Sequence, residues 1–108
     1  MKETYITIKI KLDSNNIPEE IYWSAPDGGM KDVESKAILL SFWDNKKKET
    51  LKMDLWTKEM PIDDMKSFML ETFLSMKNSI SKATGDKNLV NLVDDFCVEF
   101  EKRVSEKN

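Results

Sequence analysis

The chain has 108 residues, a formal net charge of −3, no histidine, a single cysteine and three glycines. This length is typical of one domain, and a content of 40% hydrophobic and 34% charged residues is typical of a globular protein with a solvated surface. No apolar run approaches the roughly 20 residues that span a bilayer, and the N-terminus carries no signal-peptide core. We therefore expect a soluble, cytoplasmic protein without membrane insertion.

The missing residue types exclude most catalytic chemistry. Without histidine, the chain lacks the commonest general base and the commonest transition-metal ligand. Cys97 stands alone in an apolar helical stretch, which excludes an intramolecular disulfide and favours a packing role. Neighbouring carboxylates such as Asp63 and Asp64 point in different directions on a helix, so capping and solvation explain them better than acid–base catalysis. We expect no enzymatic activity, no cofactor and no metal.

The basic residues do not indicate a nucleic-acid partner. Arg103 is the only arginine, and bidentate recognition of phosphate or guanine depends on arginine. The run Lys46–Lys48 falls where a turn is expected, so we interpret it as a solvated loop rather than an anion site. A chain with a net negative charge is also a poor binder of a polyanion.

The first half of the chain has the period-two alternation of β-strands. Residues 5–12 alternate strictly, turn-forming residues follow at 13–16, and residues 19–25 alternate again, which predicts an antiparallel hairpin. Residues 37–43 are apolar on both faces and predict a central strand, and residues 50–56 alternate once more. The second pair therefore predicts another hairpin, with a turn of about five residues.

After Trp56 the apolar spacing changes to steps of three and four residues. Pro61 suits the first helical position, and Asp63 and Asp64 lie in the first turn, where the helix dipole favours carboxylates. Gly85 is a natural C-terminal cap and Asp86 a natural start for the next helix. We therefore predict two long helices joined by a very short corner.

The order of the elements predicts an α+β fold. We expect a four-stranded antiparallel sheet, built from two hairpins over residues 1–57, and a helical hairpin over residues 61–107 packed on one face of it. The whole chain, residues 1–108, would then be one domain. This ββββαα order is similar to that of the export chaperone SecB.

Several large apolar residues fall on the sheet face that the predicted helices would leave open. Trp56 has the opposite parity to the residues of its strand that we place inward, Leu51, Met53 and Leu55. An open apolar face of this kind marks a contact with a protein partner or a second copy of the chain. The alternative is that the loop at 26–35 folds over this face; the pattern leaves residues 30–36 undetermined. The residues that we predict to make the contact are Trp56, Phe42, Leu40 and Tyr22.

Several strings of the sequence resemble the gliding motility-associated protein GldC family of Bacteroidetes. They are LLSFWD at 39–44 and TLKMDLWTKEM at 50–60, supported by NIPE at 16–19, IYW at 21–23, DMK at 64–66, ATGD at 83–86 and DFC at 95–97. The resemblance runs from about Ile8 to Phe100, and its most specific string is Asp54–Lys58. Pro61 departs from the pattern, since relatives are expected to carry a helix-capping threonine or serine there.

The resemblance implies a small soluble component associated with gliding motility, a process tied to type IX secretion, and it brings no catalytic residues with it. Our first hypothesis is therefore a non-catalytic accessory protein that acts through protein contacts. The second is a SecB-like chaperone or targeting factor that binds non-native secretory proteins, which rests on fold analogy alone. The third, an enzyme or small-ligand binder, has no motif behind it.

Overall fold

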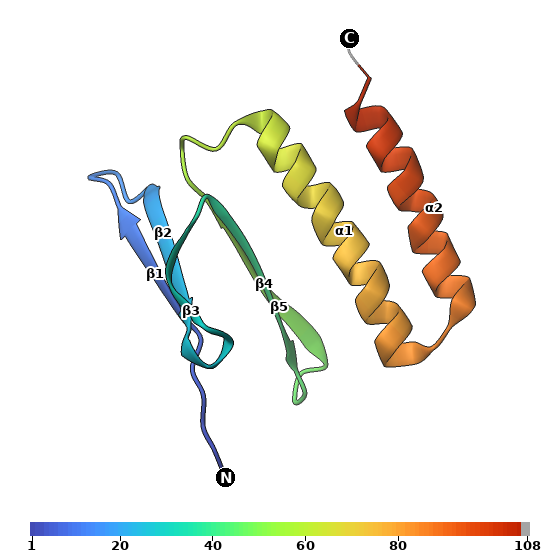
Figure 1. The fold of residues 1–108 in the computed structure, drawn as a ribbon, viewed down its shortest axis with the longest axis horizontal. Helices are drawn as coiled ribbons and strands as arrows, with labels where there is room; N and C mark the ends of the chain where they lie inside the picture. The colour runs from blue at the N-terminus through green and yellow to red at the C-terminus, as the bar shows by residue number, and fades with distance from the viewer. Residues whose placement is uncertain (107–108) are drawn as a thin grey trace. The chain divides into compact units, whose positions relative to one another are not determined.

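The computed structural model describes residues 1–106. By internal contacts the chain divides into two compact units, Met1–Met60 and the segment from Pro61 on. The first contains five strands and a 3-10 turn, and the second contains two helices (Figure 1). The strands are β1 (Thr7–Leu12), β2 (Pro18–Ala25), β3 (Met30–Ser35), β4 (Ala37–Asp44) and β5 (Glu49–Trp56). The turn is η1 (Pro26–Gly28), and the helices are α1 (Ile62–Thr84) and α2 (Lys87–Val104).

The strands form two antiparallel sheets, which corrects the predicted single four-stranded sheet. One sheet has the order β1-β2-β3, and the other is a two-stranded ribbon of β4 and β5. The strand β3 was not predicted, because Val33 is its only large β-favouring residue and charged side chains surround it. It pairs with β2 through the backbone, so residues 30–35 extend the sheet and do not fold over its face.

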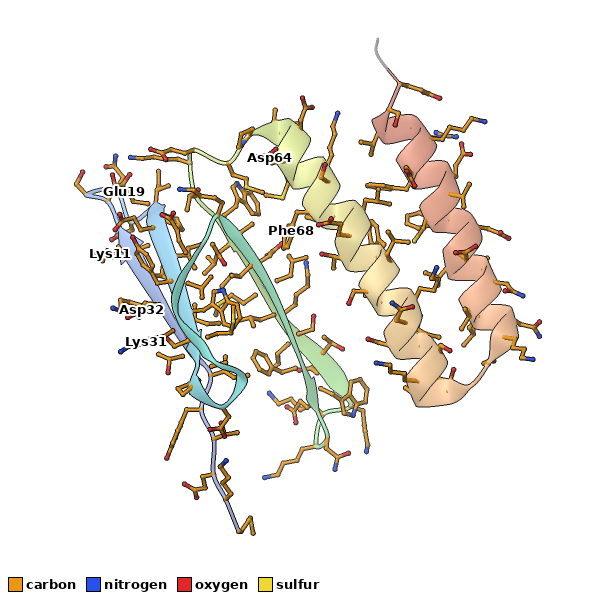
Figure 2. All side chains as sticks on the ribbon, viewed as in Figure 1. Lys11, Glu19, Lys31, Asp32, Asp64 and Phe68 are labelled. Carbon is orange, nitrogen blue, oxygen red and sulfur yellow. The ribbon has the colours of Figure 1, made fainter. Side chains whose placement is uncertain are left out.

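The three-stranded sheet has one apolar and one charged face. Its register places Ile10 opposite Ile21, and Trp23 between Ile8 and Val33, all on one face. Ile21 on the central strand is fully buried and forms the centre of this core. Figure 2 shows Lys11 on the side of the sheet that points away from the ribbon, while side chains fill the space between the sheet and the ribbon.

A short turn connects β1 to β2 in the way the sequence predicts. The side chain of Asp13 accepts hydrogen bonds from the amides of Asn15 (2.8 Å) and Ile17 (3.0 Å). Asn16 adopts a left-handed backbone with φ of 61°, which asparagine tolerates better than most residues. Pro18 then stands at the first position of β2, where a missing backbone donor costs least.

The two sheets are joined by one residue and by the segment that follows β5. Lys36 alone separates β3 from β4, and its carbonyl accepts a hydrogen bond from the amide of Thr57 (2.8 Å). The next amide, that of Lys58, donates to the carbonyl of Pro18 at 3.4 Å. The side chain of Lys58 reaches Asp13 at 3.1 Å. The segment that follows β5 is thus bonded both to Lys36, just before β4, and to the start of the three-stranded sheet.

The helical unit follows the predicted caps closely. The sequence predicts Pro61 as the first helical residue; in the structure Pro61 is the N-cap, and α1 begins one residue later, at Ile62. Gly85 ends the helix with φ of 64°. The carboxylate of Asp86 accepts from the amides of Asn88 (3.0 Å) and Leu89 (3.3 Å) and so begins α2. The helix α2 ends at Val104, three residues short of the predicted end at residue 107, which lies outside the described residues.

An aromatic cluster holds the two helices together. The ring of Phe73 on α1 meets those of Phe96 and Phe100 on α2 edge-on, with centroid distances of 5.1 and 5.2 Å. Lys77 and Asp94 form an ion pair at 2.7 Å on the same contact. Cys97 is buried, as its apolar surroundings predict.

Candidate protein-contact surface

One face of the β4–β5 ribbon carries six large apolar side chains, with the charged pair Asp44 and Glu49 at its turn end. The register places Leu40 opposite Met53 and Phe42 opposite Leu51, and residues directly opposite in an antiparallel pair share a face. Phe42 is 58% exposed, Leu51 54% and Met53 51%. We call this surface the ribbon face; its residues are Ile38, Leu40, Phe42, Leu51, Met53 and Leu55.

The structure brings together only two of the four residues predicted to make the contact. Leu40 and Phe42 lie on the ribbon face, as their shared parity predicts. Trp56 pairs with Ala37 and projects from the opposite face of the ribbon, together with Trp43. Tyr22 belongs to the other sheet. The expectation that all four share one open face is therefore wrong.

Tyr22 sits in a polar environment that does not suit an apolar contact. It pairs with Lys9 and Glu34 across the charged face of the three-stranded sheet. Its hydroxyl donates a hydrogen bond to Glu20 at 3.4 Å, and the ammonium group of Lys11 lies 5.6 Å from the ring centroid. This half-buried tyrosine is held by a local charged network.

Sequence reasoning placed three residues of the ribbon face inward, Leu51, Met53 and Leu55; of these, Leu55 is half-buried. Leu51 and Met53 alternate with polar neighbours, which predicts a buried side, yet both are more than half exposed. The signal that would have placed them beside Phe42 is the cross-strand register. The turn at 45–48 sets that register, with Asp44 opposite Glu49 and Lys48 at φ of 55°.

The two residues that follow Trp56 take part in the junction of the two sheets. Thr57 is buried to 1% exposure, and its side-chain hydroxyl has no hydrogen-bond partner among residues 1–106. The hydrogen bond to Asp13 raises the pKa of Lys58 above its usual range. The amides of Ile17 and Asn15, followed by Lys58, lower the pKa of the Asp13 carboxyl. This segment has a structural role that sequence reasoning did not assign.

A second set of exposed apolar residues lies on α2. Leu89, Leu92 and Phe96 recur at helical spacing and are 44%, 66% and 49% exposed. They flank the contact with α1, since Phe96 also touches Phe73. Apolar exposure is therefore found in both units of the chain.

Surface hollows and clusters of metal-ligating side chains bear on whether the described residues could hold a small ligand or a metal. Among residues 1–106, no group of three or more histidine, cysteine, aspartate or glutamate side chains is placed to bind a metal ion. Two hollows of the first unit are open to solvent: one of about 550 Å³ is lined by Ser24, Pro26 and Gly29–Asp32, and one of about 220 Å³ by Ile17, Pro18 and Asp54–Trp56. Neither helix in this part of the chain combines the length and apolar composition needed to cross a membrane.

Comparison with known proteins identifies a family. No curated protein and no solved structure matches the chain. The family described as gliding motility-associated protein GldC-like matches residues 18–106, from the first residue of β2 to the end of the described chain. The match includes the whole ribbon, the junction at Thr57 and Lys58, and both helices. It confirms the resemblance found in the sequence, and the chain belongs to the GldC-like family.

Proposed function

We propose that this chain is a non-catalytic accessory protein of the gliding-motility and type IX secretion machinery, and that it acts in the cytoplasm through protein contacts. The family supplies the association with gliding motility. The single observation that supports the mode of action is the ribbon face, six large apolar side chains on one side of a two-stranded sheet.

The ribbon face has the chemistry of a protein-binding surface. A contiguous apolar patch on a folded chain usually marks a contact site, and Phe and Met are enriched in the centres of interfaces. An isolated two-stranded ribbon is also only marginally stable in water. Covering Phe42, Leu51 and Met53 would remove apolar area from water and steady the ribbon at the same time.

The test replaces one exposed aromatic residue on each face of the ribbon. Phe42→Ser alters the ribbon face, and Trp43→Ser alters its neighbour on the same strand, which projects from the opposite face. The two side chains are matched in exposure, 58% and 61%. Each variant is tagged, expressed in a gliding host in place of its own copy, and captured after mild cross-linking for mass spectrometry.

We expect the original chain and Trp43→Ser to capture a gliding or secretion component in stoichiometric amount, and Phe42→Ser to lose it. Colony spreading should fall with Phe42→Ser and stay near normal with Trp43→Ser. Circular dichroism of the purified variants checks that both are folded. Equal capture by all three proteins would contradict a role for the ribbon face.

A chaperone that binds non-native secretory proteins is the second candidate. The observation that favours it is the breadth of apolar exposure, which includes Leu92 and Phe96 on α2 as well as the ribbon face. A chaperone would suppress aggregation of a chemically unfolded protein at stoichiometric ratio and would capture a broad mixture of clients. A single stoichiometric partner and no suppression of aggregation would exclude it.

A further inference from the structure

The outer edge of β5 carries backbone groups that no strand pairs within the described residues. The amide of Thr57 donates to the carbonyl of Lys36, so the odd-numbered residues of β5 direct their backbone groups toward β4. The even-numbered residues, including Lys52 and Asp54, direct theirs to the other edge. In the ordering of the sheets, that edge of β5 has no neighbour among residues 1–106. An open edge of this kind is a template for another strand.

The sequence along this edge is self-complementary about Met53. Reading outward from Met53, the chain has Asp54 and Leu55 in one direction and Lys52 and Leu51 in the other. An antiparallel partner with the same sequence, centred on Met53, therefore sets each lysine opposite an aspartate and each Leu51 opposite a Leu55. We propose that β5 pairs with β5 of a second copy of the chain in this register and forms a two-fold symmetric dimer.

Charge selects this register over the neighbouring ones. A strand pair centred on Lys52 would place two lysines face to face, and a pair centred on Asp54 would place two aspartates face to face; like charges directly opposite are destabilising. A slip that paired odd with even residues would turn the ribbon face of one copy away from that of the other. Lys52 and Asp54 are both exposed, with side chains 56% and 43% accessible.

The proposed pairing would also stabilise the two-stranded ribbon. It joins two ribbons into a sheet of β4, β5 and their symmetry mates, and sheets of three or more strands with an apolar face are stable where a lone ribbon is not. The two ribbon faces become one continuous apolar surface. The open part of this edge ends at Trp56, because the amide of Lys58 donates to the carbonyl of Pro18.

The first test reverses and then exchanges the two charges. Lys52→Asp places aspartates opposite each other, Asp54→Lys places lysines opposite each other, and the double variant restores opposite charges in exchanged positions. Sedimentation velocity over a range of concentrations gives the dissociation constant. We expect each single variant to weaken the dimer at least tenfold, about 1.4 kcal/mol, and the double variant to recover most of the loss.

The control uses the exposed ion pair between Lys11 and Glu20, which lies on the charged face of the other sheet at 3.4 Å. Lys11→Asp should leave the dissociation constant unchanged. A monomeric original chain at 100 μM or above would overturn the proposal, as would single variants that dimerise normally. A double variant that stays as weak as the single ones would overturn the register.

The second test fixes the register by cross-linking. Met53 faces Met53 of the second copy in a pair without mutual hydrogen bonds, where Cα atoms lie about 4.5 Å apart, within the range for a disulfide. Met53→Cys should therefore form a covalent dimer on mild oxidation. Leu51→Cys, equally exposed on the same face, is the matched control, because the two copies of residue 51 would lie roughly 13 Å apart.

Cross-linking of Leu51→Cys as fast as of Met53→Cys would refute the register, and no cross-linking of Met53→Cys would refute the pairing. The one natural cysteine, Cys97, is buried and supplies the background rate in the original chain. This inference does not rest on the proposed function. The dimer test concerns the edge of β5 and the capture test concerns Phe42 on the ribbon face, so either can fail alone.

Discussion

Ile21 allows the position of the core in the first unit to be tested quantitatively. It is the largest completely buried side chain there, at 0% exposure, and lies on the central strand β2 between Ile10 and Ser35. Ile21→Ala removes three carbon atoms, a loss of about 0.8 kcal/mol for each buried methylene, and leaves a cavity that adds to this. We expect the free energy of unfolding to fall by about 3 kcal/mol, and by about 1 kcal/mol for Ile21→Val.

Urea titration followed by tryptophan fluorescence and by circular dichroism measures the loss. Trp23 lies on the same face two residues along β2, so its emission reports on this core. The matched control is Ile6→Ala, since Ile6 is 74% exposed and its truncation should change stability by less than about 0.5 kcal/mol. Protein concentration is held constant, because association would add to the apparent stability.

A loss on the order of 3 kcal/mol corresponds to a fall in melting temperature on the order of 15 °C for a chain of this size. If Ile21→Ala costs less than about 1 kcal/mol, or no more than Ile6→Ala, then the three-stranded sheet is not organised around Ile21 and the register of β1, β2 and β3 is wrong.

Three further predictions concern the turns and the junction. Gly85→Ala should destabilise the helical unit by about 1 kcal/mol in thermal melts, because Gly85 has φ of 64°, whereas Gly28→Ala, with open space around it and no left-handed φ, should change little. Since the folded pKa of Asp13 is lowered, this carboxyl stabilises the fold above the ordinary aspartate pKa and loses that effect as the pH falls through its lower folded pKa. Asp13→Asn should therefore make the melting temperature less dependent on pH below about 4, and equal slopes in both proteins would contradict the turn geometry. Thr57→Val keeps the shape of a buried side chain whose hydroxyl has no hydrogen-bond partner in the described part of the chain, so urea unfolding should show no loss and a gain of up to about 1 kcal/mol; a loss above about 1 kcal/mol would indicate that the hydroxyl makes a bond.

The elements with a strong hydrophobic period could be predicted from the sequence, and the sheet arrangement could not. Alternation located β1, β2 and β5, an apolar run located β4, and the helices with their corner at Gly85 followed from helical spacing and capping chemistry. The strand β3 was not predicted from the sequence, because half of its residues are charged and it is held by backbone pairing with β2. Asp32, with φ of 46° and its amide bonded to Ser24, interrupts the regular alternation there.

The contact surface was predicted in part for a related reason. Parity within one strand places Leu40 and Phe42 together, and this needs no knowledge of the fold. Whether Trp56 or Met53 shares their face depends on how β4 and β5 align across the turn. A shift of one residue in this alignment would place Trp56 on the face of Phe42 and Met53 on the opposite face. The hydrophobic pattern does not encode the turn geometry that decides between the two alignments.

The single residue between β3 and β4 leaves the chain no spare length at Lys36. Successive side chains of a strand point to opposite sides, so one residue inserted there would turn Leu39 and Trp43 toward the side that Leu40 and Phe42 now occupy. It would also move the carbonyl that receives the amide of Thr57. A single-residue insertion should thus be tolerated among residues 2–6, which precede β1, but not at Lys36. A set of single-residue insertions scored by protease resistance would map this difference directly.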